Sequence, residues 1–426
     1  MPSLNVVNYI GQAIESVLQQ TLTGIEVLCV DAGSDDGTLE IIREYVSADS
    51  RVKLILSDKK SYGYQMNLGI RAAIGEYIGI VETDDYVLPN MYETLYNVAT
   101  KYNLDFVKSD YKKFWWDEEY SSYIKSAPSP EHYNAVIGDD ERERFFEYSS
   151  LNWTGIYRRD YLIKNDIWHN ETPGASYQDI GFWLLNMSYA KRAMWINEAF
   201  YMYRQSNPGA SMKNRGKMLC SMEEYDRVLG ILRDRGSLQA YYECLILKQM
   251  DYHVTFNRIE DSIKKQYLNE LAKVYATERE EIRGYELKPY QGSYFTWVGE
   301  AVTNRDELCD SIIRENSRVK NIIVGRKNIY LYGAGQVASS IFMQLYALGY
   351  WEDVKKTVVT SFAGDKNFYK KDIVEYEDIK DRINKDDLII LGLGKKNRDE
   401  VINMLHGDGF YNVLVPEEIE GLIYII

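Results

Sequence analysis

The sequence has few cysteines and no apolar run approaching the roughly 20 residues needed to cross a bilayer. Its four cysteines (Cys29, Cys220, Cys244 and Cys309) lie far apart and lack the spacing of a metal site. No signal peptide opens the chain. These absences argue against a membrane-spanning protein and favour a reduced, cytosolic compartment.

Positive charge is scarcer than negative charge. The 50 Lys and Arg residues are outnumbered by 64 Asp and Glu residues, so the net charge is −14. This balance opposes nonspecific binding to nucleic acid and electrostatic binding of a basic surface to anionic lipid. We therefore expect no nucleic-acid partner, although peripheral association with the inner membrane face stays open. The 426 residues predict two or three domains.

An acidic cluster, Glu82-Thr83-Asp84-Asp85, directly follows the apolar run Tyr77–Val81. Ligands of open α/β sheets bind just past the carboxyl ends of strands. Carboxylates packed this closely repel one another unless a cation or sugar hydroxyls share the site. Mg²⁺ is usually held by one or two carboxylates plus substrate phosphates. The cluster therefore indicates a metal and phosphate site, and a solvated acidic turn before Pro89 is the alternative.

A second strand end carries similar chemistry. The apolar run Ile25–Val30 is followed by Asp31-Ala32-Gly33-Ser34-Asp35-Asp36-Gly37-Thr38, which is rich in small and acidic residues. No Lys follows these glycines, so the turn differs from a phosphate-binding loop. Two such strand ends predict one crevice that accepts hydrogen bonds from a nucleoside and holds a metal, which in turn holds the phosphates.

These segments, taken in chain order, resemble the motifs of family-2 glycosyltransferases over roughly the first half of the chain. The resemblance implies a GT-A fold and an inverting, metal-dependent enzyme that uses a nucleotide sugar. The matching segments are Pro2–Asn5, the helix Tyr9–Gln20 with Thr21, Val30–Thr38, Asn67–Ile70 with Ala73 and Gly75–Ile78, and Glu82–Asp85.

The resemblance assigns roles to the acidic residues. Asp84 matches the last acid of the family's Asp-x-Asp motif and is the expected ligand of Mn²⁺ or Mg²⁺, with Asp85 beside it. Glu82 matches the first acid and would face the ribose or a metal-bound water. Asp31 matches the acid that accepts from the uracil ring; without the resemblance it would be interpreted as an Asx-turn residue.

Further donor contacts are expected from Pro2, Leu4, Asn5 and Asn67. The family usually carries an Arg before this Asn, where the chain has Met66, so that cationic contact is lost or comes from elsewhere, for example Arg71. Asn67 could contact the donor or only cap a helix.

Transfer to a hydroxyl needs a general base. The segment Tyr177–Trp183 resembles the family's Glu-Asp motif, with Gln178 in place of the Glu, and Asp179 matches the base. The alternative is that Asp179 caps the following helix. Glu171 is the next candidate for the base.

A later segment, from Tyr201 through Ser211, resembles the family's Tyr-Arg…Ser segment, and Arg204 would offset the charge of the leaving group. Some relatives place a metal-binding His here, but none of the four histidines matches. Among them, His169 could line the acceptor site or lie on a surface loop, which is the simpler interpretation.

The alternation of strands and helices predicts a mostly parallel sheet. Expected elements are helices over Tyr9–Gln20 and Tyr64–Ala73, a helix after Pro89, and strands at Val52–Leu56 and Asp105–Lys108. The chain begins inside the loop that normally follows the first GT-A strand. We expect that strand to be missing and the true start to lie upstream, because an unpaired inner edge promotes aggregation.

Three domains are predicted: a GT-A domain over 1–211, a helical middle domain over 212–325 and a small Rossmann-like domain over 326–426. The aromatic-rich stretch from about 110 to 210 would shape the acceptor site or form a core. In the last domain, Gly333–Ala338 departs from the dinucleotide fingerprint. The strand Lys356–Thr360 ends without the acid that holds an adenine ribose, and Asp365 follows only after a loop. We expect no redox use of NAD.

The fold class is thus α/β, and the expected function is a metal-dependent inverting glycosyltransferase. The donor would be a nucleotide sugar, of the UDP class, and the acceptor a hydroxyl of a cell-surface glycan or a lipid-linked acceptor. A homo-oligomer is possible through the helical middle domain. The alternatives are a non-catalytic nucleotide-sugar-binding subunit and a nucleotidyltransferase, although the basic glycine-rich loop of the latter is not visible near the N-terminus.

Overall fold

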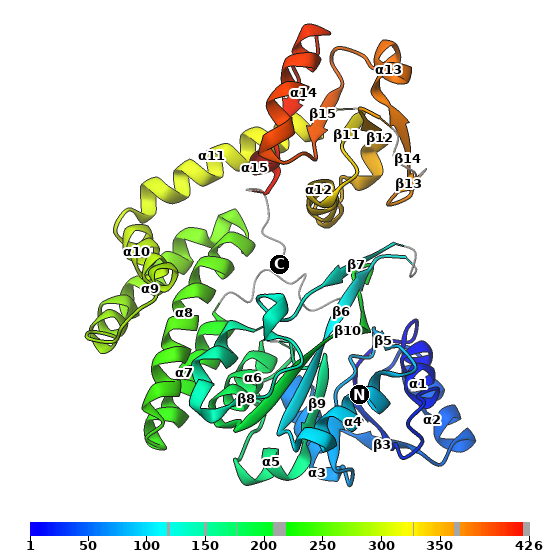
Figure 1. The fold of residues 1–426 in the computed structure, drawn as a ribbon, viewed down its shortest axis with the longest axis vertical. Helices are drawn as coiled ribbons and strands as arrows, with labels where there is room; N and C mark the ends of the chain where they lie inside the picture. The colour runs from blue at the N-terminus through cyan, green and yellow to red at the C-terminus, as the bar shows by residue number, and fades with distance from the viewer. Residues whose placement is uncertain are drawn as a thin grey trace. The chain divides into compact units, whose positions relative to one another are not determined.

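The computed structural model describes residues 1–116, 120–148, 151–175, 177–207, 219–326, 328–361 and 367–420. These residues form two compact units, one of residues 1–251 with 280–287 and the other of residues 252–279 with 288–426. Figure 1 shows the chain with its helices and strands labelled. The three-domain division stays a prediction.

The first unit begins with a small parallel sheet in the order β1-β2-β3, formed by Pro2–Ser3, Val27–Asp31 and Val52–Leu56. Helix α1, Ile10–Leu18, follows β1 and buries residues at spacings of three and four, such as Ile10, Ala13, Ile14 and Val17. This spacing places them on one helix face. The other two helices of this part are α2, Thr38–Ala48, and α3, Tyr62–Ala72.

A first strand is therefore present, but it is only two residues long and pairs with β2 alone among the described strands. On its other side the Thr83 hydroxyl donates a hydrogen bond of 2.7 Å to the Pro2 carbonyl. A side chain thus joins β1 to the acidic loop where no strand pairing does.

The second sheet is mixed, which corrects the expectation of a mostly parallel sheet. Its order is β4-β9-β6-β10-β5, with β7 on β6 and β8 on β10. β6 and β10 pair in parallel, whereas β4–β9, β9–β6 and β10–β5 are antiparallel. The strands are β4 Tyr77–Gly79, β5 Tyr86–Val87, β6 Phe106–Phe114, β7 Ser121–Ile124, β8 Ile137–Gly138, β9 Gly155–Arg158 and β10 Arg192–Arg204.

β4 and β6 run in the same direction, because both pair antiparallel with β9. The acidic loop after β4 and the end of β6 therefore lie at the same edge of the sheet. Helices α4, Met91–Tyr102, and α6, Gln178–Tyr189, pack on this sheet, and the short α5 spans Arg159–Lys164. The core beneath α6 is aromatic: Phe106, Tyr157, Phe182, Trp183 and Trp195 are all fully buried.

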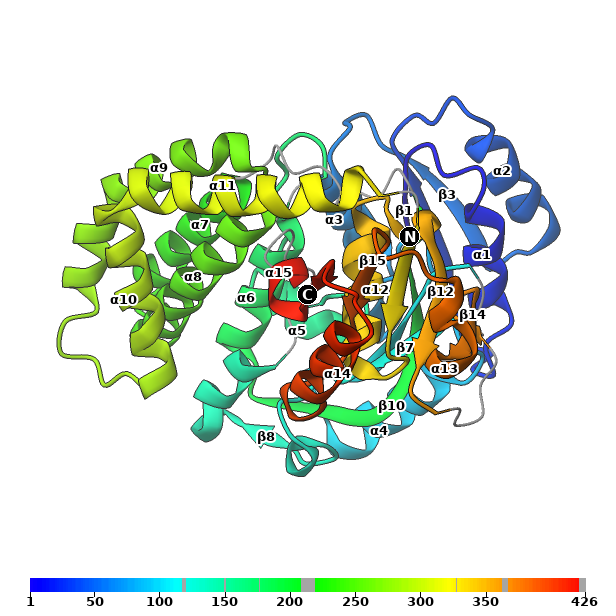
Figure 2. The same cartoon turned by 90° about the horizontal axis from the view of Figure 1, so that it is seen from above.

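The middle of the chain is helical, as predicted. It contains α7 Cys220–Asp234, α8 Leu238–Arg258, α9 Asp261–Glu281, α10 Pro289–Thr303 and α11 Arg305–Val324. Figure 2 shows α11 as one long helix that leads toward the last part of the chain. The boundary between the two compact units falls within α8.

The last part of the chain is a sheet in the order β13-β14-β12-β11-β15-β16. All neighbours pair in parallel except the edge strand β13. This is the strand order of doubly wound α/β folds. Its elements are β11 Ile329–Tyr332, α12 Gln336–Ala347, β12 Val354–Val359, β13 Asn367–Phe368, β14 Lys371–Glu375, α13 Tyr376–Ile379, β15 Leu388–Leu391, α14 Lys395–Gly407, β16 Val413–Leu414 and α15 Pro416–Glu420.

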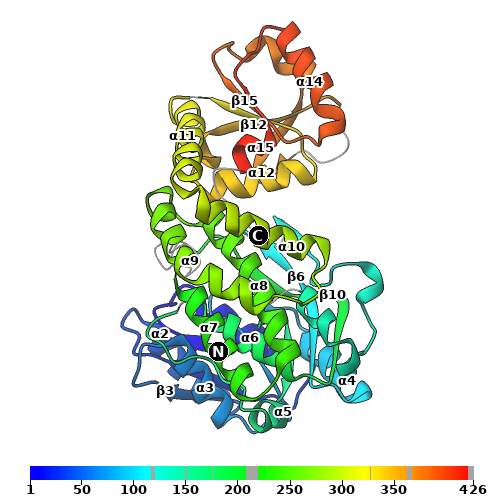
Figure 3. The ribbon, with the colours of Figure 1, turned by 90° about the vertical axis from the view of Figure 1, so that its left-hand side faces the viewer.

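Alternate residues of β11 face opposite sides of this sheet, as the period of a strand requires. Tyr330 and Tyr332 pack in one cluster with Val401 and Leu405 of α14. Figure 3 shows α12 and α14 on different sides of these strands. Both faces of the parallel sheet are thus covered by helices.

Candidate active site

The turn after β2 is built around the Asp31 carboxylate, which is fully buried. Its Oδ1 accepts from the backbone amides of Gly33 and Ser34, at 2.9 and 2.8 Å. Its Oδ2 accepts from the hydroxyls of Ser3 and Ser34, both at 2.7 Å. A carboxylate has about four acceptor positions, and four donors within the protein occupy them. Asp31 therefore acts as an Asx-turn residue, and its contact with a nucleobase stays a prediction.

The loop after β1 is joined to this turn by several hydrogen bonds. Asn5 lies in the left-handed region, at φ 55°, and its Oδ1 accepts from the Asp35 amide at 3.0 Å. The backbone N–H of Asn5 donates to the Ser34 hydroxyl at 2.9 Å. Leu4, between these polar contacts, is 40% exposed. Hydrogen bonds thus join the ends of the first two strands to each other, and the donor crevice expected there stays a prediction.

The acidic loop after β4 forms the next part of the site. Glu82 accepts from the Tyr62 hydroxyl of α3 at 2.7 Å. Burial raises the pKa of Glu82 to about 7, and the charges of Asp84 and Asp179 act in the same direction, while the Tyr62 hydrogen bond opposes them. Asp84 is half-buried, and its Oδ2 accepts from the Asn207 amide at 2.8 Å.

Asp85 points into the protein rather than into the crevice. It is 1% exposed, its Oδ2 accepts from the Tyr201 hydroxyl at 2.9 Å, and its Oδ1 accepts from the Arg204 backbone amide at 2.7 Å. Burial raises the pKa of Asp85 well above its usual range, and the charge of Asp84 adds to the effect. Since both oxygens bind β10, Asp85 positions that strand, and its role as a metal ligand stays a prediction.

Arg204 reaches the acidic loop at the end of β10. Its Nε donates to the Asp84 carbonyl at 2.7 Å, and a terminal nitrogen donates to Gln12 of α1. The guanidinium lies 5.0 Å from the ring centre of Tyr9 and 4.6 Å from that of Phe114. The predicted Tyr-Arg…Ser segment continues to Ser211, which lies outside the described residues.

Asp179 lies in the first turn of α6, where the N-terminal end of the helix favours a negative charge. The N-cap residue is Tyr177, at φ 64°, so the alternative that Asp179 is the helix cap is wrong. The charge of Asp179 contributes to the raised pKa values of Glu82 and Tyr62. The structure therefore brings Asp179, from the second half of the domain, close to the acidic loop.

The hydrogen bonds of Gln178 explain why the chain has Gln where the family has Glu. Its buried amide nitrogen donates to the carbonyls of Thr172 and Gly174, at 3.3 and 3.1 Å, and to the Thr172 hydroxyl at 3.0 Å. A carboxylate cannot donate these bonds. Gln178 thus fastens the segment that leads into α6.

Two alternatives for neighbouring residues are corrected, the helix cap at Asn67 and the surface loop for His169, whereas the roles expected of Arg71 and Glu171 stay predictions. Asn67 lies inside α3, whose cap is Ser61, so Asn67 is no helix cap; its amide pairs with the backbone of His169 at 2.9 and 3.0 Å. Arg71 pairs with Glu171 at 3.4 Å, so both are engaged with each other. His169 lies on no surface, because it is 2% exposed and stacks on Phe182 at 4.1 Å. Burial lowers its pKa to about 3.

Sequence reasoning did not predict the hydrogen bonds through which aromatic and amide groups connect these acids. Tyr201 donates to Asp85 and accepts from the Glu82 amide at 3.0 Å. Asn152 donates to the Tyr62 hydroxyl at 3.2 Å, and Tyr157 donates to the Asn152 carbonyl at 2.8 Å. These residues come from strands and loops far apart in the chain, and no local pattern marks them.

The acids fit a metal held jointly with a ligand better than one enclosed by protein. Among the described residues, no three His, Cys, Asp or Glu side chains are arranged to hold an ion. The acidic loop offers Asp84 as a half-buried carboxylate, next to two acids whose pKa values are raised. This donor set fits Mg²⁺ or Mn²⁺ bound through one carboxylate and substrate phosphates.

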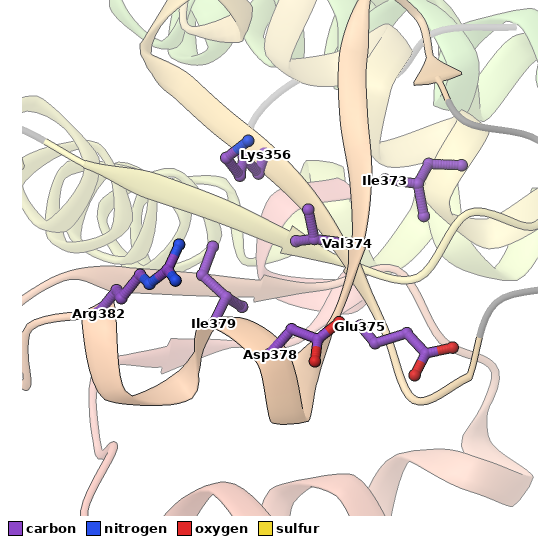
Figure 4. A pocket seen from close by; sticks show the side chains of 7 residues that line it. All are labelled: Lys356, Ile373, Val374, Glu375, Asp378, Ile379 and Arg382. Atoms are coloured by element: carbon purple, nitrogen blue, oxygen red, sulfur yellow. The ribbon is translucent and has the colours of Figure 1, made fainter.

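A hollow lies in the other unit, on β12, β14 and α13, and contains none of the residues expected to form a site (Figure 4). Lys356 beside it pairs with Asp372 at 3.0 Å. Its lining comprises Lys356, Ile373, Val374, Glu375, Asp378, Ile379 and Arg382.

Comparison with known proteins finds relatives of the first part of the chain. Residues 1–164 match the model of the glycosyl transferase family 2. The chain is 27% identical to the uncharacterized glycosyltransferase YibD of Escherichia coli over 277 residues, which is 62% of this chain and 78% of that protein. It is 31% identical to the uncharacterized glycosyltransferase EpsJ of Bacillus subtilis over 216 residues, which is 49% of this chain and 61% of that protein.

Among solved structures, residues 1–349 of TarS from S. aureus share the fold, with a TM-score of 0.52, 18% identity, and coverage of 72% of this chain and 90% of that one. None of the described helices is both long and apolar enough to span a membrane. With this match over residues 1–164 and its similarity to known glycosyltransferases, the chain contains a glycosyltransferase domain similar to family 2, and its fold resembles the GT-A fold.

Proposed function

We propose that the chain is a metal-dependent, inverting transferase that moves a sugar from a UDP-sugar to a hydroxyl of a cell-surface glycan or lipid-linked acceptor. The observation that carries the proposal is that Asp179 of α6 lies near enough to the loop after β4 for its charge to help raise the pKa of Glu82. A candidate base and a candidate donor site thus share one crevice.

The donor would lie across the first two strand ends and the acidic loop. The exposed side chain of Leu4 offers an apolar surface to a nucleobase, between the polar loops joined by Asn5. Asp84 would hold Mn²⁺ or Mg²⁺ together with the diphosphate, and that ion would neutralise the charge of the leaving group. Arg204, held against the Asp84 carbonyl, adds a fixed positive charge at the same place.

Inversion requires one displacement at the anomeric carbon, so one base is enough. Asp179 would accept the proton of the acceptor hydroxyl as its oxygen attacks. The position of Asp179 in the first turn of α6 supports this role, because the helix N-terminus favours its ionised form. Gln178 holds the preceding segment in place.

A non-catalytic nucleotide-sugar-binding subunit remains the second candidate, and it was favoured by the replacement of the family's Glu with Gln178. That replacement now has a local reason, since the amide donates hydrogen bonds that a carboxylate could not. A nucleotidyltransferase has no observation in its favour here.

The test is a panel of nucleotide sugars, screened by thermal shift with and without Mn²⁺. A ligand at a hundredfold excess over its dissociation constant stabilises the protein by roughly 2.7 kcal/mol. The best donor is then assayed for hydrolysis and transfer, with Asp179→Asn as the variant. This variant should bind the donor normally and lose roughly two to four decades of transfer rate. Donor binding without any turnover by the unaltered chain would favour the binding subunit.

A further inference from the structure

A lysine lies in the core of the first unit, directly under the candidate base. Lys108 of β6 is 0% exposed and sits between Gly155 of β9 and Trp195 of β10 in the sheet. Its ammonium donates to the Tyr157 hydroxyl at 3.1 Å and lies 4.3 Å from the ring centre of Trp183. A buried ammonium is costly unless a charge and hydrogen bonds compensate it.

The compensating charge comes from Asp179. Asp179 and Trp183 are four residues apart on α6 and therefore share one face of the helix, one turn from each other. An ammonium against the Trp183 ring thus lies beneath the turn that carries Asp179. Burial lowers the pKa of Lys108 well below its usual range, and the charge of Asp179 is the interaction that opposes this.

Among the described residues, the other groups whose pKa values respond to the charge of Asp179 are carboxylates and hydroxyls, and none of them is a cation. Glu82 of the acidic loop and Glu224 of α7 are carboxylates, whose charges disfavour a third ionised acid beside them. Glu224 itself pairs with Arg227 at 3.5 Å. Tyr62 of α3 and Tyr157 of β9 interact with Asp179 as neutral hydroxyls, since their pKa values are raised by burial.

We propose that Lys108 is a positioning residue for sugar transfer: its buried ammonium is the counter-charge that keeps the Asp179 carboxylate ionised and oriented toward the acceptor hydroxyl. The inference rests on the proposed function, in which Asp179 is the base. In that step the hydroxyl proton passes to the carboxylate and the acceptor oxygen bonds to the anomeric carbon. The bond from that carbon to the diphosphate breaks, and the nucleotide leaves with its electron pair.

Hydrogen bonds support the fixed position of this lysine. The Tyr157 hydroxyl that accepts from Lys108 donates onward to the Asn152 carbonyl, and the Asn152 amide donates to the Tyr62 hydroxyl. Tyr62 in turn donates to Glu82. One continuous chain of hydrogen bonds therefore joins the ammonium to Glu82 of the acidic loop.

The decisive variant is Lys108→Met, which keeps the volume and removes the charge. The pH profile of kcat/KM should show its acidic limb moved to higher pH by about one unit or more, because an opposite charge at close range favours the ionised carboxylate by that much. kcat should fall at least tenfold. The melting temperature should stay or rise, because replacing a buried ion by an apolar side chain is often neutral or stabilising. Lys108→Arg should restore the position of the limb.

Lys264→Met is the matched control. Lys264 is also buried, at 3% exposed, but its ammonium donates to the backbone carbonyls of Phe256 and Ile259 in the second unit. Its removal leaves those carbonyls unpaired and should lower the melting temperature, with the acidic limb in place. An unchanged limb in Lys108→Met would overturn the inference.

A second readout needs no turnover. In protein labelled with [6-¹³C]lysine, the Lys108 signal, assigned by its loss in Lys108→Met, should stay at the ammonium position at neutral pH. In Asp179→Asn it should titrate at lower pH. A neutral amine in the unaltered protein at pH 7 would overturn the inference.

The two proposals fail differently. Near-normal turnover by Asp179→Asn would show that Asp179 is not the base, and it would contradict the proposed proton transfer. If Asp179→Asn loses turnover while Lys108→Met keeps a normal pH profile, the proposed function holds. Only the positioning role of Lys108 is then contradicted.

Discussion

At the scale of single residues, the acids of this crevice differ by what holds each of them. Asp31 accepts from four donors, and each oxygen of Asp85 accepts from one donor of β10. Asp84 binds one amide through its Oδ2 and is half-buried. Glu82 is held by a phenol. Four carboxylates that look alike in sequence therefore have different tasks, and Asp84 is the one suited to an exchangeable ligand.

The first prediction concerns Asp84→Asn. We expect the Mn²⁺-dependent part of UDP binding to disappear, because an amide is a much weaker ligand for a hard cation than a carboxylate. The fold should survive, since Asp84 has one side-chain hydrogen bond among the described residues. Isothermal titration with UDP, with and without Mn²⁺, measures this.

Asp160→Asn serves as the control for Asp84→Asn, because it removes the same charge from a side chain of α5 that is 92% exposed. UDP affinity that still depends on Mn²⁺ in Asp84→Asn would assign the ion to another residue.

The second prediction follows from the raised pKa of Glu82, which is about 7 in the fold against a usual 4.5. Below pH 4.5 the group is protonated in both states. Above it the unfolded chain loses the proton first, so stability falls as the pH rises to 7. Glu82 alone should account for a loss on the order of 3 kcal/mol.

The measurement for Glu82 is the melting temperature of metal-free protein between pH 4.5 and 8. Glu82→Gln should flatten the decline, because its amide does not titrate while it can still accept from Tyr62. An equally steep decline in this variant would assign the effect to another group, of which Asp85 is the nearest candidate.

At the scale of elements, helix α3 and the segment before α6 fix the distance between the donor loops and the base. Asn67 of α3 pairs with the backbone of His169, and Glu171 pairs with Arg71. Gly63 allows the closest approach: a Cβ there would lie 1.8 Å from the Asn170 carbonyl oxygen. The segment can thus rest directly on the helix only because this side chain is absent.

The third prediction is therefore that Gly63→Ala pushes the segment away from α3. Strain of this kind typically costs 1–3 kcal/mol, so roughly that loss of stability is expected, together with slower transfer because the segment leads to Asp179. Gly69→Ala in the same helix is the control, since its Cβ would make an ordinary contact of 3.5 Å with Val30.

Gly69→Ala should be neutral or slightly stabilising, because Ala favours a helix by roughly 0.5–1 kcal/mol over Gly. Melting curves and transfer rates of both variants decide the matter. If Gly63→Ala and Gly69→Ala have the same melting temperature and transfer rate, the close approach at Gly63 is not needed for stability or transfer.

At the scale of the whole molecule, the chain combines a donor-binding unit with a second unit that ends in a doubly wound sheet. The two glycine-rich turns of that sheet pack against each other. Gly333 lies at φ +119°, and a Cβ there would be 2.6 Å from the Gly392 carbonyl oxygen. These glycines are thus needed for backbone packing within the sheet itself, so their presence is no sign of a dinucleotide.

The fourth prediction is that the full chain binds neither NAD nor NADP at micromolar concentration. β12 ends at Val359, and the next residue, Thr360, pairs its hydroxyl with Tyr332 at 2.9 Å, so no acid stands there for a ribose. Asp365, which follows later, lies outside the described residues. Isothermal titration of both dinucleotides measures this, with UDP in the presence of Mn²⁺ as the positive control. Micromolar binding of either dinucleotide would reveal a second nucleotide site.

Much of the fold was predictable because its signals are local. The buried positions of α1 recur at helical spacing, and β3 occupies the expected residues Val52–Leu56. The mixed second sheet was not predictable in this way. β9 pairs antiparallel with both β4 and β6, and these pairings join residues about 50 to 80 positions apart, which no local pattern encodes.

The sequence by itself determined the chemistry of the crevice, because carboxylates after apolar strands and an acid at a helix start must lie at strand and helix ends. Tertiary structure alone decided which of them are available. Four donors bind the buried Asp31 carboxylate, β10 donates to both oxygens of Asp85, and β6 places Lys108 where it responds to the charge of Asp179. The physical reason is that hydrogen-bond saturation and desolvation depend on neighbours distant in sequence, whereas the kind of side chain at a strand end does not.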